Sequence, residues 1–181
     1  MGLAELTGII RNRGNALAGT IQSLAEASLR EGDRWTFRQA FDLASGGTET
    51  VLLDNDLSAD ALRVVAIRIS TENAITGSVA ANADGVGSGS ALPVQNDRID
   101  ADVAALPAGV SVESGGSYSG GEASLPLDTT GGTGTGNNRT ALNQLPTANV
   151  RVEPGGSLLW TITEDSGNAS KVVFEVTVAR E

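Results

Sequence analysis

The 181-residue sequence contains no cysteine and no histidine. Disulfides, thiolate metal sites and imidazole chemistry are therefore excluded, and nucleophilic triads lack their usual base. Long apolar runs are also missing, because the opening stretch MGLAELTGIIRNRGNALAG is interrupted by Glu5, Arg11 and Arg13. We therefore expect neither a signal peptide nor a membrane span.

Basic residues are few, and lysine is almost absent. The chain has 12 basic residues against 22 acidic ones, for a net charge of −10, and Lys171 is its one lysine. A lysine-poor, acidic chain with small apolar residues is typical of proteins that work in high salt, where the Debye length falls to about 3 Å at 1 M. An acidic protein from a GC-rich genome would have the same composition. Both interpretations predict no basic patch for nucleic acid.

The helical pattern is confined to the first 30 residues. Apolar residues recur there at helical spacing and would form one narrow seam of Leu3, Leu6, Ile10, Leu17, Ile21 and Leu24. Such a seam suits packing against another subunit or against the chain's own body, and both alternatives stay open. We predict an N-terminal helical arm over residues 1–33, used for assembly or attachment through this seam.

From Arg34 onward the apolar period changes to two residues, which predicts strands. The clearest inward-facing sets are Trp35, Phe37, Phe41 and Leu43; Val65, Ile67 and Ile69; Leu158, Trp160 and Ile162; and Val172, Phe174, Val176 and Val178. Shorter strands are predicted at 48–54, 75–80, 109–113, 123–128 and 149–153. Because no crossover helix is visible after residue 33, we predict a mainly β fold, with an antiparallel β-sandwich or jelly-roll-like domain over 34–181.

Turn residues mark the boundaries of the last strands. The segment EPGG at 153–156 places proline and glycine where a type II turn requires them. The segment EDSGN at 164–168 joins the final two strands, so we expect residues 157–179 to form an antiparallel hairpin.

Three glycine-rich tracts, at 81–90, 114–121 and 129–140, predict long, exposed and adaptable loops. The stretch TTGGTGTGNNRTAL at 129–142 suggests a phosphate site, but Asn137 stands where a P-loop has its lysine, and no helix follows. We predict instead a surface loop whose contacts to a neighbour are Asn137, Asn138 and Arg139. Tyr118, isolated among glycine and serine, either contacts a ligand or folds back onto the sandwich.

Oxygen-bearing side chains alternate in the segment DNDLSAD at 54–60, as they do in a calcium loop. Ala59 and Val65, however, occupy the positions of the required glycine and glutamate. A turn between strands is the simpler prediction, with a bound ion as the alternative. Asn138 and Asn168 begin N-glycosylation patterns that are common by chance. No set of residues indicates a catalytic, cofactor or metal site.

The closing segment VRVEPGGSLLWTITEDSGNASKVVFEVTVARE resembles accessory virion proteins of tailed viruses, in which a Pro-Gly-Gly-Ser turn leads into the last strands of a jelly-roll-like domain. The acidic composition points to a virus of haloarchaea. The resemblance implies a non-enzymatic protein without cofactors, made in the host cytoplasm and placed on the virion as capsid decoration, turret, neck or tail fibre. Its implied partners are further copies of itself and other capsid or tail proteins. The alternative is a β-sandwich module that binds a host surface glycan or receptor through its loops.

Overall fold

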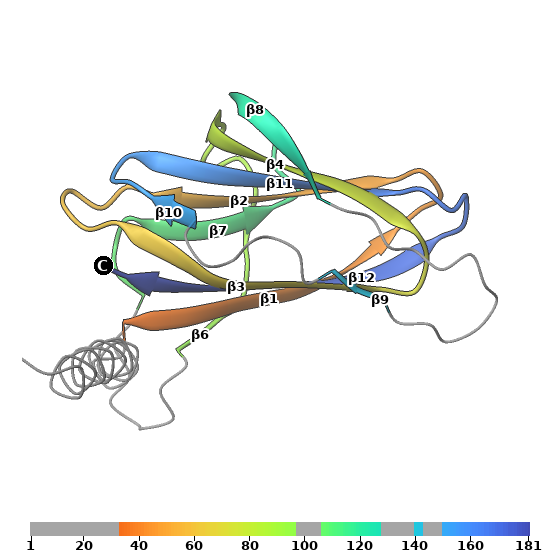
Figure 1. The fold of residues 1–181 in the computed structure, drawn as a ribbon, viewed down its shortest axis with the longest axis horizontal. Coiled ribbons are helices and arrows are strands. Elements are labelled where there is room, and N and C mark those ends of the chain that lie inside the picture. The colour runs from red at the N-terminus through yellow and green to blue at the C-terminus, as the bar shows by residue number, and fades with distance from the viewer. Residues whose placement is uncertain (1–32, 97–105, 128–139, 143–149) are drawn as a thin grey trace, which may run out of the picture.

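The computed structural model describes residues 33–96, 106–127, 140–142 and 150–181, which form twelve strands and no helix. The strands make two antiparallel sheets that lie face to face (Figure 1). In spatial order, sheet A has β10 (Val150–Val152), β3 (Leu62–Thr71), β12 (Ser170–Arg180), β1 (Arg34–Leu43) and β6 (Val94–Asn96), with β9 (Thr140–Leu142) also paired to β3. Sheet B has β5 (Ser90–Ala91), β7 (Val110–Ser114), β2 (Thr48–Asn55), β11 (Gly156–Glu164), β4 (Ile75–Asp84) and β8 (Ser119–Leu127).

This arrangement confirms the prediction of a mainly β, sandwich-like chain. Each strand predicted from the sequence is present, and β5, β6 and β9 are short strands that the apolar pattern did not indicate. The helical arm predicted over 1–33 lies outside the described residues, apart from Asp33.

Consecutive strands lie in opposite sheets from β1 to β4, and again from β11 to β12. The predicted hairpin over 157–179 is therefore wrong, because β11 pairs with β2 and β4, while β12 pairs with β1 and β3. The connection at 165–169 crosses from one sheet to the other. Apolar alternation shows which side chains face the core, but two strands facing each other across a core alternate in the same way as two neighbours.

The inner faces of the two sheets share one apolar core. The predicted inward residues of β1, β11 and β12 are all buried. Trp160 of sheet B lies against Phe174 of sheet A, with ring centroids 5.4 Å apart. Full burial of a large apolar side chain contributes roughly 1.5–3 kcal/mol, so this central contact helps to hold the sheets together.

Strand β3 departs from simple alternation at Val65. Its pairing with β12 shifts by one residue between Thr177 and Val178, which leaves Val65 as the extra residue of a β-bulge. Val64 is fully buried, whereas Val65 is only half-buried. The prediction that Val65 shares the inner face with Ile67 is therefore wrong, because the bulge moves the alternation by one position.

A buried carboxylate, that of Glu164, closes the end of the sandwich where β1 meets β2. Its oxygens accept hydrogen bonds from the N–H groups of Gly46 (2.9 Å), Ser166 (2.6 Å) and Gly167 (3.2 Å), and from the Ser166 hydroxyl. The Ser166 hydroxyl, followed by the Gly46 N–H, lowers the pKa of Glu164 to about 2. Glu164 thereby ties the turn between β1 and β2 to the connection between the sheets.

At the opposite end, the turns predicted at 54–60 and 153–156 are both confirmed. Gly155 has a φ of +75°, as a type II turn requires at its third residue. The turn at 54–60 is fastened from within, because the buried Asn55 amide donates to the carbonyls of Asp60 (3.1 Å) and of the last residue of β10 (2.9 Å).

Candidate functional site

Charged residues divide between the two sheets. All seven basic residues that the structure describes lie on strands of sheet A: Arg34, Arg38, Arg63, Arg68, Arg151, Lys171 and Arg180. Those strands carry only two acidic residues, Asp42 and Glu175. The strands of sheet B carry no basic residue and six acidic ones: Glu49, Asp54, Asp84, Glu113, Glu122 and Glu164. Although the net charge of the whole chain is −10, the strands of sheet A are therefore basic and those of sheet B are acidic.

A groove of about 520 Å³ lies on the outer face of sheet A, over the adjacent strands β1, β12 and β3. Arg38 and Arg68 stand on either side of Glu175, because the strand registers place all three in one row across the sheet. The groove is lined by three basic residues, two acidic residues, two hydroxyls and one valine: Arg38, Arg68, Lys171, Glu72, Glu175, Ser70, Thr71 and Val173. We call this surface the basic groove.

The arginines of the basic groove share one carboxylate. Arg38 Nε and Arg68 Nη1 each lie 3.8 Å from an oxygen of Glu175, and the two arginine side chains stay 67% and 63% exposed. Lys171 forms no ion pair with any residue that the structure describes. The groove therefore presents positive charge that its own acidic residues do not fully compensate.

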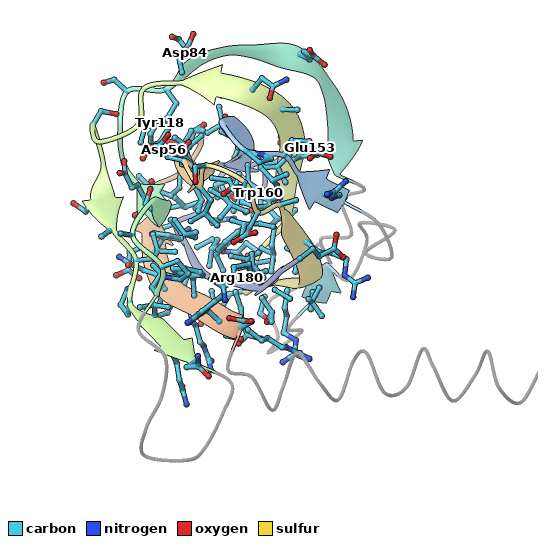
Figure 2. All side chains as sticks on the ribbon, turned by 90° about the vertical axis from the view of Figure 1, so that its left-hand side faces the viewer. Asp56, Asp84, Tyr118, Glu153, Trp160 and Arg180 are labelled. Atoms are coloured by element: carbon cyan, nitrogen blue, oxygen red, sulfur yellow. The ribbon has the colours of Figure 1, made fainter. Side chains whose placement is uncertain are left out.

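Acidic side chains gather on the sheet B side of the opposite end. We call four of them the acidic corner: Asp54 and Asp56 where β2 ends, Asp84 where β4 ends, and Glu122 on the neighbouring β8. Figure 2 shows Asp56 and Asp84 in the half of the molecule that holds sheet B, with Arg180 in the other half. Within the described chain, no basic side chain pairs with any of the four.

Repulsion between acidic side chains in this region contributes to the pKa of one of them, Asp54. Partial burial raises the pKa of Asp54, and the charges of Asp56 and Glu113 raise it further. The corner therefore depends on solvent ions, or on a partner, for its counter-charge.

Two glycine-rich loops, 85–89 and 115–118, fold against each other beside the acidic corner. The buried Glu113 carboxylate holds the first loop by accepting hydrogen bonds from the N–H groups of Gly87 (2.9 and 3.0 Å) and Gly89 (3.3 Å). Most of these loop residues are exposed, as predicted, but the loops are shorter than the tracts 81–90 and 114–121, because residues 81–84 belong to β4 and residues 119–121 to β8.

Tyr118 lies between these loops with its hydroxyl buried. A methyl group at Gly116 would come within 2.5 Å of the ring, and one at Gly89 within 2.2 Å of the hydroxyl. Burial raises the pKa of Tyr118, and the charge of Glu113 adds to the effect. Its ring packs on an apolar cluster outside the main core, formed by Leu52, Ala83 and Leu159. Of the two alternatives for Tyr118, the structure supports folding back onto the sandwich.

Asn82 allows this outer cluster to form. Ala81 packs on the main core, whereas Ala83, two residues later, faces the outer cluster. Side chains two apart normally share a face, but Asn82 has a φ of +56° beside a shift in the pairing of β4 with β8. The left-handed residue therefore reverses the alternation, and asparagine tolerates that conformation better than most side chains.

The other predicted contact residues lie outside the part of the chain that the structure describes. They are Leu3, Leu6, Ile10, Leu17, Ile21 and Leu24 of the arm, and Asn137, Asn138 and Arg139 of the third tract. They stay predictions. Among the described residues, no three acidic side chains group closely enough to hold a metal ion. The same residues contain no helix with the length and hydropathy needed to cross a bilayer.

The sequence did not predict the basic groove or the acidic corner. The expectation that the chain has no basic patch is wrong, because three of its few basic residues line one groove on sheet A. The alternation of each strand already places Arg38, Arg68 and Lys171 opposite inward-facing aromatic or aliphatic residues. What the pattern lacks is the information that β1, β12 and β3 are neighbours. Comparison with protein-family models and with curated proteins finds no match.

Proposed function

We propose that the protein is a non-enzymatic structural component of a virus particle, which decorates or extends the capsid or tail through homo-oligomeric assembly. The domain is a jelly roll adapted to high salt. The observation that carries this proposal is the strand order, in which β1, β12, β3 and β10 lie opposite β2, β11, β4 and β8. Jelly rolls have eight strands in two such sheets, and viral capsid proteins use them repeatedly.

Assembly also explains the open edges of the sandwich. β8 is a nine-residue strand at the border of sheet B, and β4 is its one partner among the strands that the structure describes. An edge of this length is prone to unwanted pairing unless something covers it. A neighbouring subunit in a closed oligomer provides that cover.

Size-exclusion chromatography with light scattering in molar salt tests the assembly, and negative-stain imaging shows its form. We expect a defined closed oligomer. A strict monomer over the whole concentration range would contradict this role. Genes for capsid or tail proteins beside the gene for this chain would support the viral part of the proposal.

The basic groove favours a second candidate function, the binding of an acidic carbohydrate. Ser70 lines the groove together with Arg68 and Lys171, and this combination of a hydroxyl with positive charge suits a carboxylated or sulfated sugar. An array of acidic glycans tests it, with Arg68→Ala as the variant that should lose binding. Tyr118 is not part of this candidate site, because its ring is used in packing the loops.

A further inference from the structure

We propose that the basic groove binds the acidic corner of a second copy of this chain. The proposal rests on the assembly role described above and names one contact that contributes to it. Each copy offers both surfaces, the groove on sheet A and the corner on sheet B, towards opposite ends of the sandwich. The contact is therefore heterologous, so that it closes into a ring or continues as a chain of subunits.

The groove side of the contact has exposed cations with unused hydrogen-bond donors. Glu175 is shared by two guanidinium groups at 3.8 Å, a distance at which neither arginine forms a close bidentate pair. Lys171 has no ionic partner among the described residues. An incoming carboxylate can therefore bind Lys171 and an arginine without breaking a strong internal ion pair.

On the acidic corner, the side chains lack basic partners within the described chain. Glu175 of β12 and the C-terminal Glu181 each lie within 4.0 Å of two arginines, whereas the described chain supplies no cation to Asp56 or Asp84. Both of these aspartates are exposed. Charge complementarity of this kind sets the partner and the orientation of a contact, and it speeds association.

Two variants separate the surfaces. The groove variant is Arg68→Glu with Lys171→Glu, and the corner variant is Asp56→Lys with Asp84→Lys. We expect the full-length protein to self-associate in sedimentation velocity at about 0.1 M salt, and either variant alone to weaken association by at least about tenfold. Mixed in equal amounts, the two variants should form a heterodimer, because the intact corner of one still fits the intact groove of the other.

Matched controls carry the same kinds of charge change elsewhere. Arg63→Glu alters sheet A at the far end from the groove, and Asp165→Lys alters an exposed residue in the connection between the sheets. Both controls should associate like the original protein. Thermal unfolding midpoints should agree among all variants to within a few degrees, which shows that each one folds.

The outcomes distinguish this proposal from the assembly role. An oligomer that is insensitive to the groove and corner variants would overturn the proposed contact and leave the assembly role standing. A monomer at every salt concentration would overturn both. If the protein is monomeric and binds heparin through Lys171, the groove takes an acidic polysaccharide, and the second copy is the wrong occupant.

Discussion

Glu164 shows how a single carboxylate can hold two turns. Its pKa in the folded chain is about 2, below the ordinary value of 4.5, because the ionised form accepts four hydrogen bonds. A lowered pKa means that the stabilisation is complete above about pH 4.5 and is lost as the pH falls towards 2.

We expect Glu164→Gln to lower the urea midpoint at pH 7, since the amide nitrogen of glutamine cannot accept the N–H bonds that the second carboxylate oxygen accepts. The difference from the original protein should shrink as the pH is lowered from about 4.5 to about 2. Urea titrations at several pH values measure it. Asp165→Asn, next to Glu164 but exposed, is the control and should behave like the original protein throughout.

The ring of Tyr118 and the hydrogen at Gly116 occupy neighbouring space, which makes a double-mutant cycle informative. Gly116→Ala should destabilise the fold by about 1–3 kcal/mol, because the added methyl overlaps the ring. Tyr118→Ala should itself cost about 2 kcal/mol through lost packing. In the double variant the overlap with the ring is gone, while the Ser88 hydroxyl stays 2.6 Å from the added methyl, so the total should fall short of the sum by about 1 kcal/mol. Strict additivity in chemical denaturation would contradict this packing.

The sequence predicts the individual strands well, but it does not predict which strands pair with each other. The alternation of Trp35, Phe37 and Phe41 predicts the inner face of β1, since burial of one face imposes a period of two. The prediction that Val65 faces the core is wrong because a bulge adds one residue to the strand, and the types of the side chains give no sign of it. The predicted hairpin over 157–179 is wrong because two strands that face each other across the core show the same apolar alternation as two strands paired in one sheet. Predicting the basic groove requires knowing which strands lie beside β12, and the sequence of a single strand does not contain that information.

In strand β4, the backbone conformation of Asn82 determines which side chains face the main core and which face the outer cluster. We expect Asn82→Gly to leave stability within about 0.5 kcal/mol of the original, because glycine adopts a positive φ freely. Asn82→Val should cost about 1–2 kcal/mol, since a β-branched side chain is strained there. Both variants lose the weak bond from Asn82 to Glu122 (3.4 Å), so their difference isolates the backbone. Equal urea midpoints would contradict the proposed reversal.

At the scale of the whole molecule, the division of charge predicts a salt-dependent stability. The pKa of Asp54 is raised by burial and by neighbouring acids, so its charge opposes folding at pH values above that pKa. Asp54→Asn should therefore raise the thermal midpoint at pH 7 and about 0.1 M salt. At about 1 M salt the gain should diminish, because screening weakens the repulsion from Asp56 and Glu113. A gain that does not change with salt would contradict this electrostatic origin.

The strand order also determines when the sandwich can form during synthesis. β11 and β12, which occupy interior positions in the two sheets, come last among the strands in the chain, and β1 finds its partner β12 only across more than a hundred residues. Pairing over such separations gives a high contact order and slow folding. Until β12 emerges from the ribosome, β1 and β3 lack the strand that joins them. The nascent chain is then most exposed to aggregation, and a chaperone would have its clearest opportunity to act.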